Sequence, residues 1–566
     1  MATGVLLGVL CIVAANAIAP RFRVAAPLVL VVVGVAVSVQ PVVHVSGIVI
    51  EPELVLGGVL PLLLFAAAVS MPATSFRRNF GLIAGLSVTL VVITSLALGA
   101  LFAAVLPDLG FAGGVALGAV LSPTDAVATS IVKRLGVAPR VVSVLDGEAM
   151  LNDASALVVL RTALAAVAAT GGAGGVGTAI GRFALSVVIA TAIGAAVGAA
   201  TLVVRRRIHQ ATVNTLLSFA VPFLAFQPAE HAGASGLVAV VAAGLVIGQG
   251  APRYLAPRHR ANERINWHTI EMLLEGGLFL VMGLQLVTLL GDDRAQLGLA
   301  AELAALALAI TLVARAVYVV PLLRGARHRQ ARHEARRGHL EEMHNSIVPT
   351  EAARRALDDH ENAIVERLRA RLRRVLADVD YGASLMLGRR AAVLLVWAGM
   401  RGAITVAAAQ TLPGDFPHRS LLVLVAFLVA VASLLVQGGT LGWVVRALKF
   451  PPPDAAAIAR ERDAFTGELE RVGFAVLDAP ATVASYGDDI LARMRQRLAE
   501  TRDGERLVLA AVLVDQVFDA QRAHILAARR DGVYSTETLG LALTRVDAMQ
   551  IGVGLTRRGR IDDHDA

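Results

Sequence analysis

Cysteine and lysine are nearly absent from this chain of 566 residues. Cys11 is the single cysteine, which excludes an internal disulfide and a cysteine-based metal site. Lys133 and Lys449 are the only lysines, so arginine supplies almost all of the positive charge behind a formal net charge of +8. Arginines that flank apolar segments usually mark the cytoplasmic side of a membrane. We therefore interpret the charge as membrane topology and expect no nucleic-acid partner.

Two motifs of enzymatic chemistry are also absent. The sequence contains no GxxxxGK[ST] loop, which argues against an ATP-driven pump, and no HExxH motif, which argues against an intramembrane metalloprotease. We expect a chain that is not an enzyme and that uses no cofactor.

Long apolar runs are abundant, since hydrophobic residues make up 56% of the chain. A soluble core does not need uncharged runs of about twenty residues, whereas a membrane-spanning helix does. The runs predict an all-α polytopic membrane protein with about thirteen spanning helices. The predicted spans are 3–19, 24–39, 54–69, 81–106, 111–132, 141–170, 180–204, 213–226, 235–248, 270–290, 299–323, 391–412 and 421–444.

Basic residues fall in every second loop if the N-terminus lies outside the cell. The inner loops hold groups such as Arg77/Arg78 and Arg205–Arg207, whereas the outer loops hold only scattered cases such as Arg294. The run 3–19 has no basic residues before it, so we expect a retained first helix and not a cleaved signal peptide. The sequence thus predicts a multi-pass protein of the cell membrane.

Charged stretches divide the chain further. We distinguish a first membrane part (1–323), a charged helical insert (324–390), two last membrane helices (391–448) and a cytoplasmic tail (449–566). The insert fits either a solvated helical hairpin or a specific binding surface. The tail is expected to be regulatory or dimer-stabilising. It should contain an amphipathic helix over 505–530 that stops near Gly532, and another that starts at Ser535 or Thr536.

Acidic side chains gather in an otherwise apolar stretch between residues 121 and 159. They are Asp125, Glu148 and Asp153, among alanine, valine, leucine and glycine. A charged side chain at membrane depth is costly and persists there mainly with a partner or a water-filled path. The cluster is therefore a predicted functional site.

Pro123 should break or kink its helix, because proline removes a backbone donor and clashes with the preceding turn. Irregular backbone at membrane depth lines cavities, where freed carbonyls and helix ends can hold ions. Thr124 then offers an oxygen ligand, and Asp125 can neutralise exposed helix N-termini. The alternative is a plain proline kink with Asp125 in a polar crevice.

Glu148, Asn152 and Asp153 follow in the next predicted helix. Glu148 and Asn152 share a face, while Asp153 points about 100° further round. Such oxygen ligands suit a hard cation and not a soft metal. Glu148 alone could instead lie in water at the helix entrance. Arg401, well inside the span 391–412, is expected to pair with Glu148, either structurally or as part of transport, and to leave Asp153 free to titrate.

Proton coupling follows from the chemistry of a carboxylate. In water at pH 7 an aspartate is protonated about one time in a thousand, and removal from water favours the neutral form. A carboxylate poised between these forms binds a proton or a dehydrated cation, but not both. Alternating exposure of one such site exchanges the two.

The chain resembles the monovalent cation:proton antiporters, namely electroneutral sodium/proton exchangers of the bacterial NhaP-like type. The resemblance covers residues 3–444 apart from the insert. The motifs that carry it are SPTDAVA from Ser122, GEAMLND from Gly147, SGLVAVVAAGLVIG from Ser235, the segment 267–285 and GMRGA from Gly399.

The resemblance implies an antiporter fold with inverted repeats and with crossed, discontinuous helices at residues 124–125 and in the Arg401 segment. It also implies a homodimer in the membrane lipid, with Asp153 as the shared carrier of cation and proton. Around that carrier it places Thr124, Asn152 and Asp125, with Na⁺ at Asp153 and Thr124 and with Glu148 paired to Arg401. Electrogenic relatives have two adjacent aspartates where this chain has Asn152 and Asp153, which favours one-for-one, electroneutral exchange.

Three residues depart from the pattern of the family. Ala149 stands where serine is common, which removes a hydroxyl ligand, and Ala66 stands where many relatives have glutamate. Glu275 stands where asparagine is common, so it is either a second titrating group or a hydrogen-bonded packing residue.

We therefore predict a secondary active transporter that exchanges Na⁺ for H⁺ by alternating access, in the service of pH homeostasis and sodium tolerance. The alternatives are a K⁺/H⁺ antiporter, a channel, and a non-transporting membrane sensor with a transporter-like core.

Overall fold

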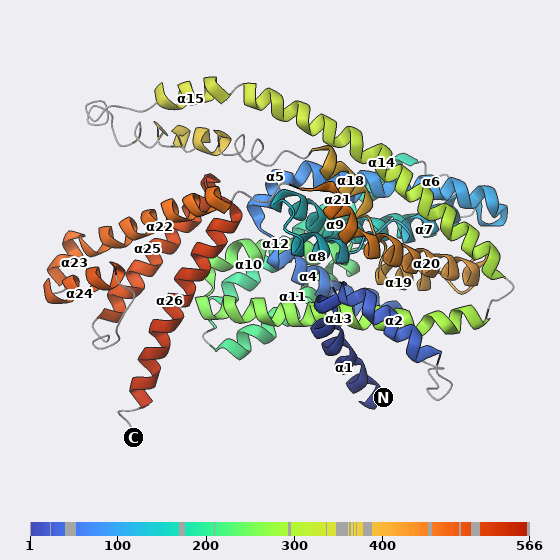
Figure 1. Ribbon diagram of the computed structural model, residues 1–566, viewed down its shortest axis with the longest axis horizontal. Helices are drawn as coiled ribbons and strands as arrows, with labels where there is room; N and C mark the ends of the chain where they lie inside the picture. Colours follow the sequence, from blue (N-terminus) through green and yellow to red (C-terminus); the bar gives the residue numbers. More distant parts are fainter. Residues whose placement is uncertain are drawn as a thin grey trace. The chain divides into compact units, whose positions relative to one another are not determined.

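The computed structural model consists of helices joined by mostly short connections (Figure 1), with no strand in the ranges that it describes. Those ranges are 2–22, 24–39, 52–168, 176–208, 210–292, 296–335, 337–346, short pieces between 360 and 376, 388–450, 455–485, 488–499 and 510–562. The chain divides into two compact units. The first unit comprises Met1–Gln249, Glu263–Ala326 and Leu387–Pro451, and the second comprises Gly250–Asn262, Arg327–Met386 and Pro452–Ala566.

The first unit holds the apolar helices, several of which are hydrophobic on all sides, as expected of segments surrounded by lipid or protein. They are α1 (Ala2–Ile18), α2 (Ala26–Ser38), α3 (Pro52–Leu54), α4 (Leu60–Ser70), α5 (Ala73–Ala84), α6 (Leu90–Val105), α7 (Gly110–Val120), α8 (Val127–Arg134), α9 (Pro139–Ala168), α10 (Val176–Arg205), α11 (Ala211–His231), α12 (Gly236–Tyr254), α13 (Pro257–Asp292), α14 (Leu297–Ala335), α18 (Arg389–Trp397), α19 (Ala403–Gln410), α20 (Arg419–Ser433) and α21 (Gly439–Leu448). Helix α13 begins, and α14 ends, in the second unit.

Among the residues that the structure describes, six helical segments are long and apolar enough to cross a membrane. They are Thr74–Val105, Pro139–Val167, Ala184–Arg205, Gly236–Tyr254, Leu297–Arg332 and Arg419–Leu448. Shorter apolar helices, such as Gly4–Ile18 and Ala26–Ser38, coincide with other predicted spans. The all-α architecture is therefore confirmed, whereas the number of about thirteen spans stays a prediction.

Two helices are longer than the apolar runs that predicted them. Helix α13 begins at Pro257 instead of residue 270, and α14 continues to Ala335 instead of ending at residue 323. Hydropathy marks only the apolar part of a helix, whereas arginine, glutamate and alanine continue it because their intrinsic helix propensity is high. The extensions carry many of these residues.

Two helices are interrupted where the sequence predicted it. The first break separates α7 from α8 at residues 121–126, which contain Pro123. The second break separates α18 from α19 at residues 398–402, and Gly402 there has an extended backbone. Proline and glycine both disfavour a continued helix. These interruptions confirm the predicted discontinuous helices.

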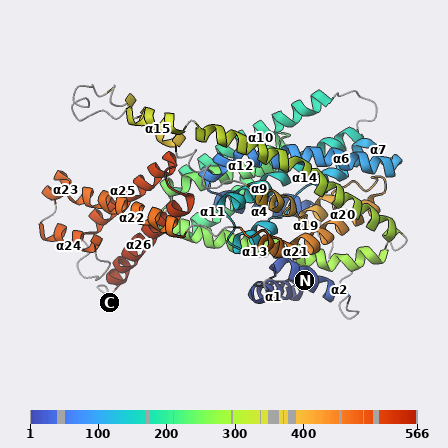
Figure 2. The ribbon, with the colours of Figure 1, turned by 45° about the horizontal axis from the view of Figure 1, so that its top comes forward.

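Helix α7 leads into the first break and packs against α6, α9 and α19. Its contact with α6, visible in Figure 2, is unusually close. A Cβ atom at Gly114 would lie 2.5 Å from the backbone oxygen of Gly99, and one at Gly118 would lie 2.4 Å from that of Ser95. Only glycine allows two backbones to approach so closely, so this contact fixes the position of the break.

Two π-helical turns occur beside the breaks, at Gly85–Thr89 between α5 and α6 and at Leu434–Gly438 between α20 and α21. A π-turn closes hydrogen bonds five residues apart and often marks a functional position, because it redirects the side chains around it. The first of these turns presents Ser87, whose hydroxyl donates to the backbone oxygen of Glu148 at 3.2 Å.

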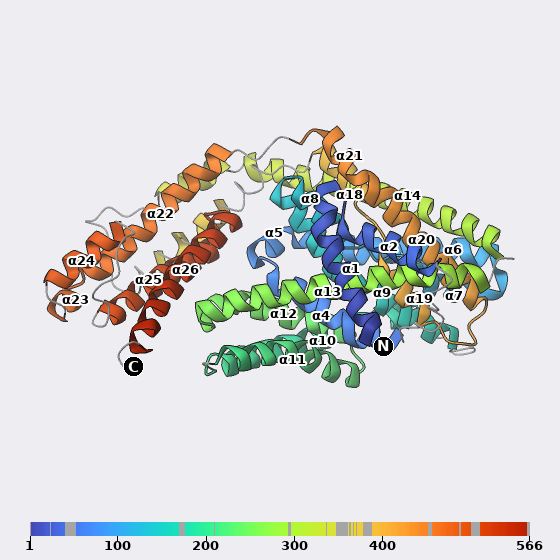
Figure 3. The ribbon, with the colours of Figure 1, turned by 60° about the horizontal axis from the view of Figure 1, so that its bottom comes forward.

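The helices of the second unit are drawn in Figure 3, and most of them carry charged residues. They are α15 (Arg337–Ser346), α22 (Ala455–Leu477), α23 (Pro480–Ser485), α24 (Asp488–Ala499), α25 (Ala510–Asp531) and α26 (Thr536–Asp562). Apolar side chains of α22, α25 and α26 form their own core around Phe465. Burial and a hydrogen bond to Glu468 raise the pKa of Tyr534, which keeps this phenol a neutral donor.

The helix ends of the tail agree with the sequence. Helix α25 ends before Gly532, whose φ of 69° favours glycine, and Ser535 caps α26 by accepting the Thr538 backbone N–H at 3.1 Å. The predicted stop and restart are confirmed. The predicted helix start at residue 505 and much of the insert lie outside the described residues.

Candidate functional site

Helix α9 carries three of the predicted site residues into the interior. Glu148 and Asn152 are each 1% exposed, and Asp153 is 3% exposed. The alternative position of Glu148 in water at the helix entrance is therefore wrong. Buried polar side chains of this kind require partners, and most of those partners come from the two breaks.

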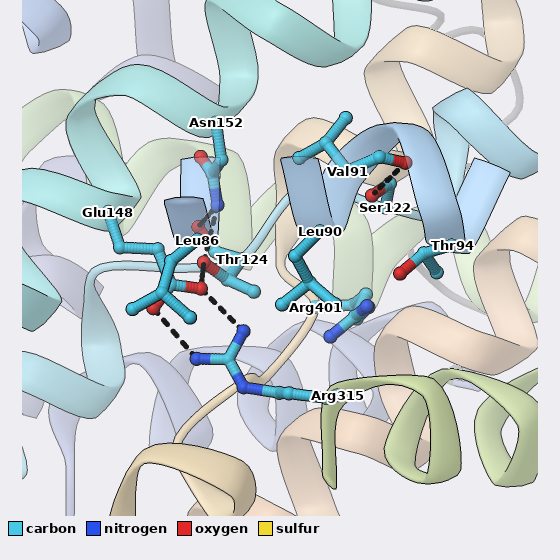
Figure 4. Close-up of a pocket in the computed structure, with 10 residues that line it drawn as sticks. All are labelled: Leu86, Leu90, Val91, Thr94, Ser122, Thr124, Glu148, Asn152, Arg315 and Arg401. Carbon is cyan, nitrogen blue, oxygen red and sulfur yellow. Dashed lines mark hydrogen bonds and ion pairs between the residues drawn. The ribbon is translucent and has the colours of Figure 1, made fainter. Parts of the chain in front are cut away.

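Thr124, in the first break, connects the side chains of α9 (Figure 4). Its hydroxyl donates to Oε1 of Glu148 at 3.2 Å and accepts a short hydrogen bond from Nδ2 of Asn152. The same Nδ2 also lies 3.3 Å from the Thr124 backbone oxygen. Thr124 and Asn152, which the sequence predicts together at the carrier site, thus meet Glu148 around one hydroxyl.

The carboxylate of Glu148 pairs with Arg315 of α14. Figure 4 shows the two dashed contacts of this pair. Nη1 of Arg315 lies 2.5 Å from Oε1, and Nη2 lies 2.7 Å from Oε2. The Nε of Arg315 donates to the backbone oxygen of Leu395 on α18 at 2.7 Å. The predicted partner, Arg401, is wrong, because two arginines reach this region and only Arg315 directs two guanidinium N–H groups at the carboxylate oxygens.

Arg401 belongs to the second break and binds backbone. Its Nε donates to the oxygen of Leu121 at 2.9 Å, and its Nη1 donates to the oxygen of Gly399. Both carbonyls lie where a helix is interrupted, so neither has an ordinary intrahelical donor. The guanidinium therefore donates hydrogen bonds to both breaks: to Leu121 in the first break and to Gly399, in its own segment, in the second.

The two breaks also meet at Asp125. The backbone N–H of Asp125 donates to the oxygen of Met400 at 2.7 Å, and Oδ1 of Asp125 accepts the Val127 N–H at 2.9 Å. The other carboxylate oxygen lies against Gly402, where a Cβ atom would be only 1.3 Å from Oδ2. The crossed arrangement places Asp125 close enough to Asp153 for the two carboxylates to repel each other.

Two oxygens of the site have no hydrogen-bond donor among the described residues. They are Oδ1 of Asp153 and Oδ1 of Asn152, both buried. Asn152, but not Asp153, also lines a small cavity, whose residues Figure 4 draws. Its lining residues are Leu86, Leu90, Val91, Thr94, Ser122, Thr124, Glu148, Asn152, Arg315 and Arg401. Unsatisfied buried oxygens are the groups that a proton or a hard cation would bind.

The three departures lie around this centre on different helices. Ala149 follows Glu148 on α9, and Ala66 is buried on α4. Glu275, on α13, is half-buried and interacts electrostatically with Asp125 and Glu271.

Sequence reasoning missed three polar residues that support the site. Arg315 stands alone in the apolar segment LVARAVYVV, and Ser433 and Gln437 stand four residues apart in the last apolar run. A charged or polar residue inside a predicted span is the signal that identifies such positions. Such a residue does not by itself indicate which side chain it contacts, so the sequence does not distinguish Arg315 from Arg401 as the partner of Glu148.

Comparison with known proteins identifies the family. The family model described as "Sodium/hydrogen exchanger, transmembrane" matches residues 7–447. The chain belongs to the sodium/hydrogen exchanger family. Members of the sodium/hydrogen exchanger family are transporters of the cation/proton exchange class and not enzymes, and the apolar helices described above make this chain a multi-pass membrane protein.

Relatives of this sodium/hydrogen exchanger extend over most of its length. An uncharacterised Na⁺/H⁺ exchanger of Mycobacterium tuberculosis (strain ATCC 25618 / H37Rv) is 30% identical over 489 residues, which are 84% of this chain and 79% of the relative. The Na⁺/H⁺ antiporter NhaP of Pseudomonas aeruginosa is 26% identical over 70% of this chain and 81% of the relative. The NhaP-like resemblance is confirmed.

The fold has a solved counterpart among sodium/hydrogen exchangers. The sodium proton antiporter MjNhaP1 from Methanocaldococcus jannaschii matches with a TM-score of 0.53 at 16% identity, over 78% of this chain and 97% of that chain. The match shows a common all-α antiporter fold.

Proposed function

We propose that this chain exchanges Na⁺ for H⁺ by alternating access, with Asp153 as the shared carrier. The observation that supports this most directly is the buried Oδ1 of Asp153, which has no hydrogen-bond donor among the described residues. An ionised carboxylate in that position is costly unless a proton or a cation neutralises it. The proton and the cation therefore compete for one oxygen of Asp153.

The proposed Na⁺ site uses oxygens around that carboxylate. Asn152 contributes Oδ1, because its Nδ2 already donates to Thr124 and leaves the oxygen without a donor. Thr124 contributes its oxygens, and Asp125 adds negative charge from the crossing of the breaks. Oxygen donors of this kind suit a hard cation. Ala149 offers no hydroxyl, so the ligand set is small.

We propose that the exchange is electroneutral. Asn152 is neutral, and Glu148 is held in its ion pair with Arg315. One titrating carboxylate then carries either one Na⁺ or one H⁺ in each half-cycle. In the same proposal the exchanger is a homodimer in the cell membrane. Its N-terminus lies outside and its tail lies in the cytoplasm, because the arginine-rich loops then fall inside.

The test uses purified protein in liposomes that contain a pH-sensitive dye, with Na⁺, K⁺ or Li⁺ added outside. We expect proton movement in response to Na⁺ and expect Asp153→Asn to abolish it, because the amide cannot exchange a proton for a cation. Asp108→Asn is the matched control, since Asp108 is 87% exposed and lies outside the site. A response to K⁺ alone would make the chain a K⁺/H⁺ antiporter, and no response to any cation would favour a sensor.

Glu275 tests the stoichiometry. We expect exchange by the unchanged chain and by Glu275→Gln to be equally indifferent to an imposed membrane potential, because Asp153 alone carries the exchanged charge. The variant should change the apparent affinity for Na⁺, since Glu275 interacts with Asp125. The measurement is the initial rate of dye response with the potential clamped and then released. If the unchanged chain follows the potential and Glu275→Gln does not, Glu275 is a second carrier.

A further inference from the structure

The second break leaves backbone groups without intrahelical partners, and the structure provides a partner for four of them. Asp125 donates to the oxygen of Met400, and the Arg401 side chain donates to the oxygen of Gly399. The remaining two groups are the oxygen of Trp397 and the N–H of Arg401. Both are bonded by uncharged side chains from the last apolar run.

These side chains are Ser433 and Gln437, which are 0% and 1% exposed. Nε2 of Gln437 donates to the Trp397 oxygen at 3.1 Å, and the Ser433 hydroxyl accepts the Arg401 N–H at 2.9 Å. The hydroxyl then donates to Oε1 of Gln437 at 2.5 Å. Each donor in this series of three hydrogen bonds has one acceptor, so the two side chains act as one unit.

The π-turn Leu434–Gly438 brings this unit to the break. Gln437 belongs to the turn, and Ser433 immediately precedes it. The turn itself packs closely, since a Cβ atom at Gly438 would lie 3.2 Å from Sδ of Met400. Because Met400 is the residue whose oxygen binds Asp125, the turn supports the same segment that the first break contacts.

We infer that Ser433 and Gln437 are positioning residues of the transport site, which hold residues 397–401 in the conformation that meets Asp125. The inference rests on the proposed function. Neither side chain reaches the carrier, so their effect passes through the backbone of the break. Loss of the Gln437 donor leaves the part-buried Trp397 oxygen without this hydrogen bond and releases the segment that contacts Asp125.

Gln437→Glu tests this role within one protein sample. A protonated carboxyl keeps both bonds, because one oxygen accepts from Ser433 and the other donates to Trp397. An ionised carboxylate cannot donate. We expect the variant to exchange Na⁺ for H⁺ like the unchanged chain at mildly acidic pH and roughly tenfold more slowly at alkaline pH. The measurement is the ratio of the two rates at each pH, with a return to acidic pH to show recovery.

Few charges near the turn compete with this carboxyl. Helices α2, α20 and α21 pack against the turn. Helix α2 carries no charged residue, Arg419 begins α20, and Arg446 lies in the last turn of α21. Helix α18, whose Trp397 oxygen bonds Gln437, begins with Arg389 and Arg390. The second break adds the guanidinium of Arg401, which is bonded to Leu121 and Gly399.

Three further variants complete the test. Gln437→Met has no donor, so its rate should be lowered to a similar degree at every pH. The double variant Ser433→Ala/Gln437→Met should be no slower than Gln437→Met, because one unit is lost in both. Gln227→Glu places a carboxyl at an exposed position of α11 and should keep a constant ratio.

The outcomes separate the inference from the proposed function. If the unchanged chain does not exchange cations for protons, the proposed function is wrong. If the unchanged chain exchanges but the ratio for Gln437→Glu is the same at every pH, or if Gln437→Met exchanges at the full rate, the positioning role is wrong.

Discussion

Replacing Arg315 by methionine is expected to destabilise the first unit by about 3–5 kcal/mol, because it leaves Glu148 as an uncompensated buried charge. Both side chains of the pair are 2% exposed, and two hydrogen bonds join them. Thr124 can donate only one hydrogen bond to the stranded carboxylate. The effect is measured as a fall in the midpoint of thermal unfolding of the protein in detergent.

A double variant identifies the partner of Glu148. Adding Glu148→Gln to Arg315→Met removes the stranded charge and should recover most of the lost stability. The oxygen of Leu395 still lacks its donor, so the recovery is incomplete. Arg161→Met, which breaks the more exposed pair with Glu230, is the control and should lower the midpoint much less.

Arg401→Met should behave differently from Arg315→Met. It removes donors to Leu121 and Gly399 and leaves the Glu148 pair intact. Adding Glu148→Gln to this variant should therefore lower stability further instead of restoring it. If Glu148→Gln restores the stability of Arg401→Met but not that of Arg315→Met, the partner of Glu148 is Arg401 and not Arg315.

Replacing Gly402 by alanine is expected to slow exchange by about a hundredfold. A misplacement of about 1 Å in an enzyme active site lowers the rate by a similar factor. The new Cβ atom would overlap Oδ2 of Asp125 at 1.3 Å and would lie 2.4 Å from its Cγ. Asp125 cannot move away freely, because its N–H is bonded to Met400 and its Oδ1 to Val127. The measurement is the initial exchange rate in liposomes at saturating and at low Na⁺.

Gly439→Ala is the matched control for that substitution. Gly439 begins α21, and nothing lies within 4 Å of its added Cβ atom. The control should exchange at the normal rate and melt at the normal temperature. Full activity of Gly402→Ala would mean that the close approach of Asp125 is not required for exchange.

The sequence was a good guide to the two breaks because each has a local cause. Pro123 interrupts its own helix through the missing N–H, and the glycines around Arg401 permit an extended backbone. The common face of Glu148 and Asn152 on α9 was also predictable from helix geometry. Local rules carry these conclusions, and no long-range information is needed.

The ion pair depended on long-range packing that no local rule describes. Arg315 and Arg401 both stand in apolar surroundings, and each is a reasonable partner for Glu148 by composition. The crossing of α14 over α18 decides the matter, because it points the guanidinium of Arg315 between Leu395 and the carboxylate. The lengths of α13 and α14 were missed for a simpler reason, since hydropathy does not register their charged turns.

The mutual bonding of the two breaks also has a consequence for the biosynthesis of the protein. Leu121 and Arg401, which are bonded in the folded protein, are 280 residues apart in the chain. At about 5–20 residues per second, a ribosome makes the second break roughly 15–55 s after the first. During that interval the Asp125 N–H and the Leu121 oxygen lack their final partners. The contacts between the two breaks therefore form late in synthesis, and a nascent chain that stops before residue 399 has none of them.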